Sequence, residues 1–139
     1  MRAAAIDLGK VRVGLAVSDE LGLLAHPRPH LDGSNPGRLV EALAEVADAE
    51  GIEVFLVGLP ATLSGREGPP ARRARRFADR LRERTGRAVQ LVDERLSTRE
   101  ARSRLAEGGI GERAARQKID SAAAAVLLQS WLDARAPRP

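Results

Sequence analysis

Three acidic residues that are far apart in the sequence occupy positions where a carboxylate is unusual. Asp7 lies inside a short apolar run, Glu94 follows a later one, and Asp120 begins the last apolar segment of the chain. Aspartate is disfavoured in strands, and a carboxylate on the buried side of an element is costly unless it is paired or bound to a metal. Three such groups would repel one another if they converged, and divalent cations would relieve that repulsion. The sequence therefore predicts a cation site built from these three residues.

Each carboxylate also has a purely structural interpretation, which the sequence leaves open. Asp120 can cap the helix that it begins, and Glu94 can pair with Arg95 or Arg99. Asp93 competes with Glu94 as a ligand because side chains alternate along a strand, so that these two residues point to opposite faces of a sheet. The sequence does not decide which of the two faces holds the site.

Positive charge is concentrated in the second half of the chain. The segment from Arg66 to Lys118 holds 16 basic and 8 acidic residues, whereas the rest holds 7 basic and 11 acidic residues. All basic residues except Lys10 and Lys118 are arginines, whose planar guanidinium binds phosphate through several donors. This pattern favours a nucleic-acid partner, although the same arginines can simply face water. Only 2% of the residues are aromatic, which argues against base stacking and for contacts with the nucleic-acid backbone.

Several classes of protein are excluded by composition. The 139 residues contain no cysteine, which rules out disulfide frameworks, thiolate zinc sites and cysteine nucleophiles. No apolar run approaches the roughly twenty residues that cross a bilayer, so we expect no membrane association. Asp7 comes too early for a secretory leader peptide, and we therefore expect a cytoplasmic protein.

Apolar periodicity and turn residues predict the elements that would position these groups. The order is three strands, then a helix, a strand, a helix, a strand and two helices. It implies the α/β class, with a five-stranded mixed sheet (an antiparallel meander extended by parallel strands) and helices on both faces. We expect one domain over residues 1–139, with residues 135–139 as a frayed tail. The predicted strands cover Ala3–Leu8, Val11–Ser18, Leu21–His26, Val54–Val57 and Ala88–Val92, and the predicted helices run from Pro36 to the closing Gly51 and over Pro70–Thr85, Ser97–Glu107 and Ile119–Ala134.

Four short motifs occur in order along nearly the whole chain. The first is Asp7-x-Gly9-x-x-Arg12-x-Gly14, and the second is Val57-Gly58-Leu59-Pro60 with Gly65. The third is Asp93-Glu94-Arg95-Leu96-Ser97-Thr98, and the fourth is Lys118-Ile119-Asp120-Ser121-x-Ala123-Ala124 with Leu128-Gln129. Together they resemble the YqgF/RuvX family, described as pre-16S rRNA nucleases and earlier as Holliday-junction resolvases.

The resemblance implies a ribonuclease H-like fold, a cytoplasmic location and a role in ribosome biogenesis. It also implies a nuclease that processes the 5' end of pre-16S rRNA by metal-dependent phosphodiester hydrolysis, carried out by Asp7, Glu94 and Asp120. Related junction resolvases use a fourth carboxylate one turn along the last helix, where this chain has Ala123.

In the predicted mechanism Asp7 bridges two Mg²⁺ or Mn²⁺ ions, and Glu94 and Asp120 complete the ligand set, with Asp93 as the other possible ligand. In such sites the metals lie roughly 3.5–4 Å apart, where one activates water and the other stabilises the leaving oxygen. Magnesium keeps several waters and needs few protein carboxylates, so three acids suffice. The residues predicted to contact the nucleic acid are Arg12, Arg72, Arg75, Arg76, Arg95 and Lys118.

Two other functions are compatible with this fold and charge distribution. The first is a module that binds nucleic acid without cutting it. The second is a Holliday-junction resolvase, which shares the chemistry and acts on branched DNA in place of precursor rRNA. Because a resolvase cuts two strands symmetrically, it works as a dimer. The sequence contains no clear dimer signal, so it leaves open whether the protein is a monomer or a homodimer.

Overall fold

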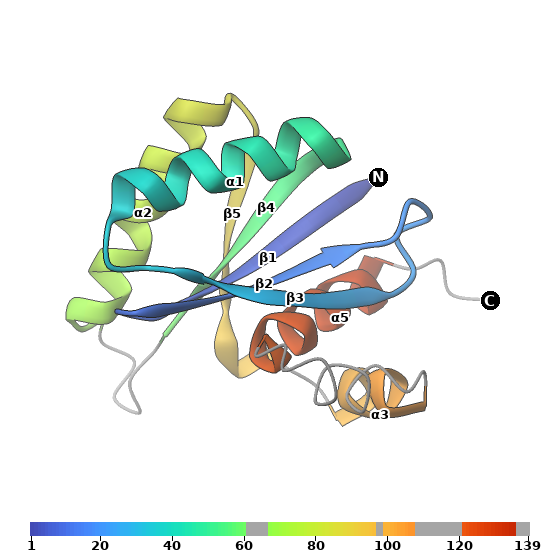
Figure 1. Ribbon diagram of the computed structural model, residues 1–139. Coiled ribbons are helices and arrows are strands. Elements are labelled where there is room, and N and C mark those ends of the chain that lie inside the picture. The colour runs from blue at the N-terminus through green and yellow to red at the C-terminus, as the bar shows by residue number, and fades with distance from the viewer. Residues whose placement is uncertain (61–66, 97–98, 108–120, 136–139) are drawn as a thin grey trace.

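Asp7 lies on the middle strand, β1, of a five-stranded sheet (Figure 1). The computed structural model describes residues 1–60, 67–96, 99–107 and 121–135. β1 and β3 both pair antiparallel with β2, whereas β4 runs parallel to β1 and β5 runs parallel to β4. The predicted mixed sheet is therefore confirmed. Its strands are β1 (Arg2–Leu8), β2 (Arg12–Ser18), β3 (Ala25–Asp32), β4 (Ile52–Leu59) and β5 (Ala88–Asp93), in the spatial order β3-β2-β1-β4-β5.

Helices cover both faces of the sheet, as Figure 1 shows. Ala4 and Ile6 of β1 belong to the apolar core under α1 and α2, whereas Ala3 and Ala5 belong to the core under α5. Because side chains alternate along a strand, Asp7 follows Ala5 onto the α5 face. The helices are α1 (Pro36–Glu50), α2 (Pro69–Thr85), α3 (Arg99–Glu107) and α5 (Ala122–Arg135), and a short 3₁₀ turn, η1 (Glu94–Leu96), follows β5.

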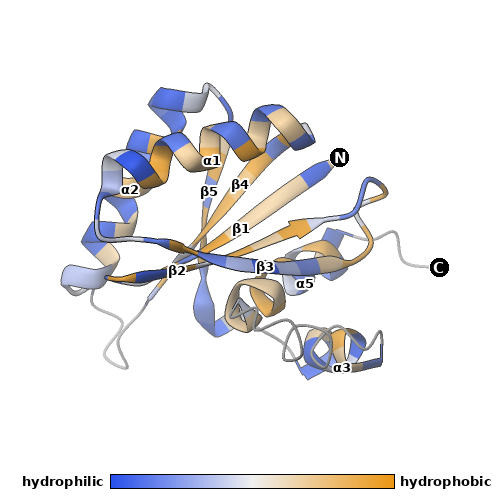
Figure 2. Cartoon of the chain, in the orientation of Figure 1, coloured by the Kyte–Doolittle hydropathy of each residue, from blue (hydrophilic) through white to orange (hydrophobic). Residues whose placement is uncertain are grey.

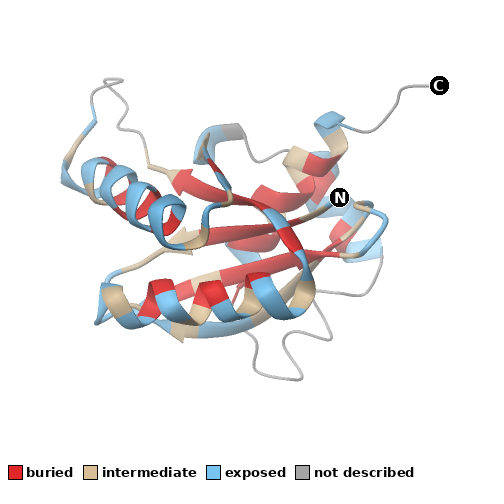
Figure 3. Cartoon of the chain, turned by 90° about the horizontal axis from the view of Figure 1, so that it is seen from above, coloured by how far each residue is buried: buried red, intermediate tan, exposed pale blue. Residues whose placement is uncertain are grey.

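The distribution of apolar residues explains this layering. The central strands are apolar over most of their length, whereas the helices carry polar residues on their outer faces (Figure 2). α1 and α2 turn residues such as Leu43, Phe77 and Leu81 toward the sheet and leave their other faces exposed (Figure 3). Burying one such side chain stabilises the fold by roughly 1.5–3 kcal/mol. None of the helices within the described residues is long and apolar enough to span a membrane.

The ends of α1 and α2 lie where turn and cap residues predict them. The side-chain oxygen of Asn35 accepts a hydrogen bond from the backbone N–H of Arg38 at 3.2 Å, and Pro36 occupies the first turn of α1. Gly51 ends α1 and Gly86 ends α2, each with a φ of 67°. This left-handed backbone conformation favours glycine, so these two helix ends are encoded locally.

The third strand differs from its predicted position. The prediction of a strand over Leu21–His26 that ends at Pro27 is wrong, because β3 covers Ala25–Asp32 and includes both Pro27 and Pro29. Proline has no N–H to donate to a strand ladder and is confined to edge strands, and β3 is an edge of this sheet. Leu21 lies in the turn after β2 and is 79% exposed.

Other element boundaries differ by a few residues. β4 covers Ile52–Leu59 and extends beyond the predicted Val54–Val57, because Gly58 and Leu59 continue the parallel pairing with β5. This extension brings Gly58 into the sheet. The predicted helix starts at Ser97 and Ile119 lie outside the described residues.

α5 packs closely on the sheet, and a buried glutamine contributes to this contact. Gln129 is fully buried; its Oε1 accepts a hydrogen bond from the backbone N–H of Ala25 at 2.9 Å, and its Nε2 donates to the carbonyl of Leu23 at 3.0 Å. These bonds offset the cost of burying the amide. Small residues in the same core let the helix backbone approach the strands: Ala3, Ala5, Ala16 and Ala25 of the sheet, and Ala124 and Ala125 of α5.

The hydroxyl of Ser121 is inserted between β2 and β3 at the start of α5. It accepts a hydrogen bond from the backbone N–H of Leu15 at 2.9 Å and donates one to the carbonyl of Arg28 at 2.6 Å. Leu15 and Arg28 are register partners, next to the point where the ladder between the two strands is irregular. The hydroxyl therefore bridges two groups of the β2–β3 ladder and holds the start of α5 against the sheet.

Ser121→Ala would leave the buried Leu15 N–H and the carbonyl of Arg28 without this partner, at a cost of roughly 1–3 kcal/mol. We expect the free energy of unfolding, measured by urea denaturation, to fall by about that amount. Ser103→Ala removes an exposed serine hydroxyl from α3 and is the control, with an expected change within about 0.5 kcal/mol. Equal stability of the two variants would contradict the bridging role of Ser121.

Candidate active site

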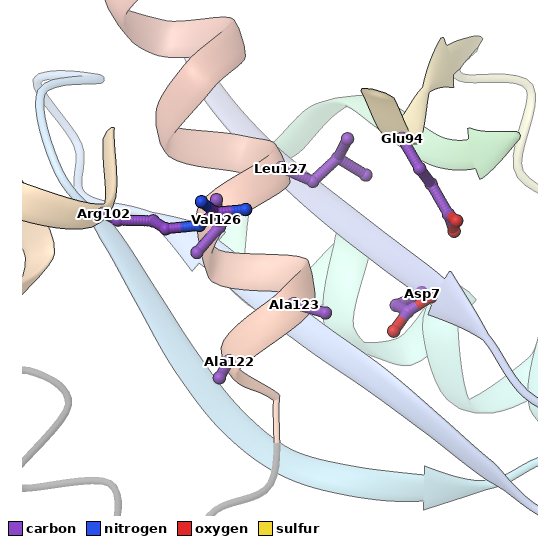
Figure 4. Close-up of a pocket in the computed structure, with 7 residues that line it drawn as sticks. All are labelled: Asp7, Glu94, Arg102, Ala122, Ala123, Val126 and Leu127. Carbon is purple, nitrogen blue, oxygen red and sulfur yellow. The ribbon is translucent and has the colours of Figure 1, made fainter. Parts of the chain in front are cut away.

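A pocket of about 340 Å³ lies where the carboxyl ends of the central strands meet the start of α5 (Figure 4). Asp7 comes from β1, Glu94 from the turn after β5, and Arg102 from α3. The pocket therefore combines a pair of carboxyl groups with a guanidinium. Its remaining wall belongs to α5 and consists of Ala122, Ala123, Val126 and Leu127.

Two glycines flank Asp7 in the sheet. Gly14 of β2 is its register partner, and Gly58 of β4 is the next residue in the parallel register on the other side. A Cβ atom on Gly14 would lie 3.4 Å from the Cβ of Asp7 and 3.5 Å from the Cβ of Ala124. The lack of a side chain at Gly14 thus leaves room for α5 to pack directly beside Asp7.

Glu94 reaches Asp7 by crossing over Gly58. A Cβ atom on Gly58 would lie 2.8 Å from Oε1 of Glu94 and 3.2 Å from its Cγ, so any larger residue would displace the glutamate side chain. Figure 4 shows Glu94 directed toward Asp7. Glycine at position 58 therefore allows the second carboxyl group to meet the first.

Asp7 lies close enough to Glu94 to raise the pKa of the Glu94 carboxyl group. Glu94 is exposed as a residue, yet desolvation of its carboxyl group raises its pKa above the ordinary value. The negative charge of Asp7 and a hydrogen bond with it raise that pKa further, and the charge of Asp93 acts in the same direction. A cation between the two carboxylates would remove this repulsion. Carboxylate oxygens are ligands that suit Mg²⁺ and Mn²⁺, so the donor set fits such an ion.

Asp93 forms an ion pair with Arg95, a residue that the sequence predicts to contact phosphate. Oδ2 of Asp93 lies 2.7 Å from Nη2 of Arg95, and its Oδ1 accepts a hydrogen bond from the backbone N–H of Arg95 at 2.9 Å. These hydrogen bonds lower the pKa of Asp93. Val92 packs in the core under α5, and alternation then places Glu94 on the same face as Asp7. Of the two acids between which the sequence could not choose, the structure brings Glu94 to Asp7.

The third predicted ligand, Asp120, lies outside the described residues, as does Lys118. Asp120 immediately precedes Ser121 in the sequence, and the Cα of Ser121 lies 3.7 Å from the position of a Cβ atom on Gly14. Among the described residues, no group of three or more histidine, aspartate or glutamate side chains is placed to hold a metal ion. The described part of the site is therefore the Asp7–Glu94 pair.

The other residues predicted to contact phosphate are spread over the surface. Arg12 begins β2 and is exposed. Nη1 of Arg72 donates a hydrogen bond to the carbonyl of Glu67 at 3.3 Å, and the guanidinium of Arg75 is ion-paired with the Glu67 carboxylate. Arg76 lines a different pocket, which lies between α1 and α2. None of these described residues lines the pocket at Asp7.

Sequence reasoning missed Arg102, which lines the pocket from α3 (Figure 4). It is one of 21 arginines, and no motif around it sets it apart before the helix is placed. Its guanidinium suits a phosphate oxygen. Ala123, where the resemblance raised the possibility of a fourth carboxylate, also lines the pocket and adds no ligand there.

Comparison with known proteins identifies the family. A model of the RuvX family, described as Holliday junction resolvase, matches residues 1–134. The chain belongs to the RuvX family. A relative from Anaeromyxobacter sp. (strain K), named "Putative pre-16S rRNA nuclease", is 47% identical over 137 residues, which is 99% of this chain and 100% of the relative. A relative of the same name from Desulforudis audaxviator is 37% identical over 135 residues, 97% of this chain and 96% of the relative. The RuvX resemblance of the four motifs is thus confirmed.

Solved structures similar to this RuvX chain include junction resolvases. Thermus thermophilus RuvC in complex with a Holliday junction substrate superimposes with a TM-score of 0.61 at 18% identity, covering 97% of this chain and 95% of that one. The fowlpox virus Holliday junction resolvase gives a TM-score of 0.56 at 12% identity, covering 96% and 99%. At such identities the likeness concerns the fold, and it confirms the predicted ribonuclease H-like fold. The family and the names of the relatives fit both the predicted nuclease function and its resolvase alternative.

Asp7→Asn removes a charge that raises the pKa of Glu94, so that pKa should fall toward its ordinary value in the metal-free protein. A carbon-detected NMR titration, with the signal assigned through Glu94→Gln, measures the pKa of Glu94.

A raised pKa means that the folded state binds this proton more tightly than the unfolded chain, so the free energy of unfolding falls as the pH rises through the folded pKa of Glu94. Asp7→Asn should reduce that loss. Asp79→Asn, whose wild-type carboxylate pairs with Arg82 on α2, is the control, and a Glu94 pKa unaffected by Asp7→Asn would contradict the pairing.

Gly58→Ala places a methyl group where the side chain of Glu94 now lies. Because the carboxyl end of Glu94 is flexible, we expect it to move away from Asp7 while the free energy of unfolding changes by less than about 1 kcal/mol. The pKa of Glu94 should then fall toward its ordinary value although both carboxyl groups are present. Gly37→Ala in the first turn of α1, where a Cβ atom would approach no atom closer than 3.4 Å, is the matched control. A Glu94 pKa that stays raised in Gly58→Ala would show that Gly58 does not position it.

Proposed function

We propose that this RuvX chain hydrolyses phosphodiester bonds of nucleic acid with divalent metal ions held at the Asp7–Glu94 pocket. The observation that carries the proposal is the pair of carboxyl groups held together, against their mutual repulsion, by β1 and the turn after β5. Binding a cation is the direct way to offset such repulsion. The location of the pocket also supports the proposal, because open α/β sheets bind their ligands at the carboxyl ends of strands.

Asp7 and Glu94 would hold the ions, and Asp120 is the proposed third ligand. Its support is its neighbour Ser121, whose hydroxyl bridges β2 and β3 and whose Cα lies beside Gly14, the register partner of Asp7. Two Mg²⁺ or Mn²⁺ ions, when bound, supply an activated water and stabilise the leaving oxygen. Three carboxylates suffice for such ions because much of their coordination is completed by water and substrate oxygens.

The remaining pocket residues bind and shield the substrate in this proposal. Arg102 is the proposed contact for an oxygen of the scissile phosphate, because a guanidinium offers several donors in a planar arrangement. Val126 and Leu127 form an apolar side of the pocket, which limits the approach of bulk water. Asp7 is fixed on the central strand, so its orientation does not depend on a loop.

The proposed substrate is the 5' end of precursor 16S rRNA, processed in the cytoplasm during ribosome biogenesis. Relatives that match this chain over nearly its whole length, at up to 47% identity, carry the name pre-16S rRNA nuclease. A four-way DNA junction is the second candidate. It is supported by the description of the family model and by the RuvC neighbour, which was solved with a Holliday junction. The two candidates also differ in assembly, because symmetrical cutting of a junction needs two copies of the chain.

A cleavage assay tests the proposal. The purified protein is incubated with Mg²⁺ or Mn²⁺ and either RNA that carries the 5' end of precursor 16S rRNA or a four-way DNA junction. We expect the RNA to be cut, and Asp7→Asn and Glu94→Gln to slow cutting by at least about 100-fold, the scale of losing one preorganised electrostatic contact. Asp79→Asn on α2 is the control. If only the DNA junction is cut, the protein is a resolvase. If nucleic acid is bound but not cut with either metal, the proposed hydrolysis is wrong and the protein is a non-catalytic binding module.

Divalent cations should also stabilise the folded protein, because they bind the native carboxyl pair and have no such site on the unfolded chain. We expect the Tm of the wild-type protein to rise with added Mg²⁺ or Mn²⁺ and the rise to be smaller in Asp7→Asn. Differential scanning calorimetry, with EDTA-treated protein as the starting point, measures both. Equal shifts in the wild-type protein and in Asp7→Asn would place the bound ions elsewhere.

A further inference from the structure

A second pocket, of about 430 Å³, lies on the opposite face of the sheet from Asp7. It is enclosed by the turn after β1, the start of α1 and one side of α2. Its floor is apolar and includes Leu39 and Phe77, which belong to the core under these helices. We call it the basic pocket because four cationic side chains line it: Lys10, Arg73, Arg76 and Arg80.

Six of the seven arginines of α2 fall into two sets. Arg73, Arg76 and Arg80 are three and four residues apart, so they share one side of the helix, and that side borders the basic pocket. Within the part of the chain that the structure describes, neither they nor Lys10 forms an ion pair with a carboxylate. Positive charge is thus gathered there with no ion-paired carboxylate among the residues that the structure describes. By contrast, three other arginines of α2 are paired: Arg75 with Glu67, Arg82 with Asp79 and Arg84 with Glu41.

Two further features of the basic pocket favour an anion. Nε of Arg73 is buried and has no hydrogen-bond partner among the described residues, so an oxygen from a ligand would satisfy a donor that is otherwise unpaired. Pro36 at the start of α1 also lines the pocket, and the first turn of α1 contains no acidic residue. The positive end of that helix dipole is therefore not balanced by a carboxylate on the helix itself.

We propose that the basic pocket binds a backbone phosphate of the same nucleic-acid strand that is cut at Asp7, an inference that rests on the proposed function. Leu8 directly follows Asp7 and lines the basic pocket, so the two pockets lie on either side of the carboxyl end of β1. A strand that passes over this edge of the sheet contacts both. Because guanidinium groups bind phosphate whatever the base, the contact positions the substrate without reading its sequence.

The test is a binding experiment in the Asp7→Asn background, where the proposed chemistry is disabled and binding is measured alone. Fluorescently labelled RNA from the 5' end of precursor 16S rRNA is titrated at salt concentrations from 50 to 200 mM. Arg76→Ala with Arg80→Ala should weaken binding by at least about tenfold at low salt. It should also reduce the slope of log K against log salt by about 0.7 for each lost phosphate contact on a single strand.

The matched control is Arg82→Ala with Arg84→Ala, which removes the same charge from the same helix, at arginines that are already paired with Asp79 and Glu41. We expect this control to leave the salt slope unchanged, and thermal melts of both double variants verify that they are folded. Equal salt slopes for the two double variants would overturn the proposal, because the weaker RNA binding would then follow from the lower positive charge of α2 as a whole and not from the basic pocket. Failure of the wild-type protein to cut RNA would overturn the proposed function without touching this comparison.

A second arm distinguishes the source of the phosphate. Inorganic phosphate is titrated into the same proteins and the Tm is followed. We expect little stabilisation at millimolar phosphate, because a single free phosphate makes contacts at the basic pocket alone, whereas a nucleic-acid strand extends beyond it and gains further contacts. Stabilisation by phosphate that depends on Arg76 and Arg80, together with an unchanged RNA salt slope, would assign the pocket to a small phosphate ligand and overturn the nucleic-acid proposal.

Discussion

The carboxyl groups of Asp7 and Glu94 repel each other when both are ionised, so the fold holds them together against their own electrostatics. The backbone of Asp7 cannot move away from Glu94, because it lies on the central strand with paired strands on both sides. Glu94 folds over Gly58 because that position has no side chain. The raised pKa of Glu94 reflects first the desolvation of its carboxyl group and then the negative charge of Asp7 beside it. A cation that relieves this repulsion would therefore be bound and would stabilise the fold through the same interaction.

On the α5 side of the sheet, small residues allow the helix and the strands to approach each other closely. Alanines on the strands and on α5, with Gly14 beside Asp7, let the helix backbone lie near the sheet. The polar groups that this closeness buries are satisfied by Ser121 and Gln129, both of which hydrogen-bond to backbone groups near or in β2 and β3. These bonds have a direction, unlike apolar contacts, so they set the position of α5 along the sheet. The pocket wall that α5 forms is positioned by them.

The two faces of the sheet carry groups of opposite charge. One face presents the carboxyl groups of Asp7 and Glu94, and the other presents the cations of the basic pocket, which have no ion-pair partner among the described residues. Three other arginines of α2 are paired with acids of the same chain, so the formal charge of +4 is not displayed evenly. Exposed pairs of this kind add little stability, and their main effect is to leave the uncompensated charge in one place.

Local sequence patterns by themselves determined the order and type of the elements, the caps of α1 and α2, and the family. Apolar alternation, cap residues and glycines act over a few neighbouring positions, so they can be recognised without knowing the rest of the chain. The same alternation identified Asp7 as an unusual acid and set Asp93 and Glu94 on opposite faces. It could not say which face meets Asp7, because that depends on whether Val92 packs under α5 or under α1 and α2. Likewise, a local pattern predicts that the prolines of β3 end a strand. They are tolerated within it because the topology places that strand at an edge of the sheet.

Only the tertiary structure decided which arginines are paired, that Arg102 borders the carboxyl pair, and that the Ser121 hydroxyl bridges β2 and β3. Leu15 and Ser121 are 106 residues apart, and no local pattern records such a contact. Arginine is abundant along α2 and α3, and the sequence presents these residues as equivalent candidates. They become distinct once packing sets each one beside an acid, a pocket or water, because the energy of a charge depends on what surrounds it in space.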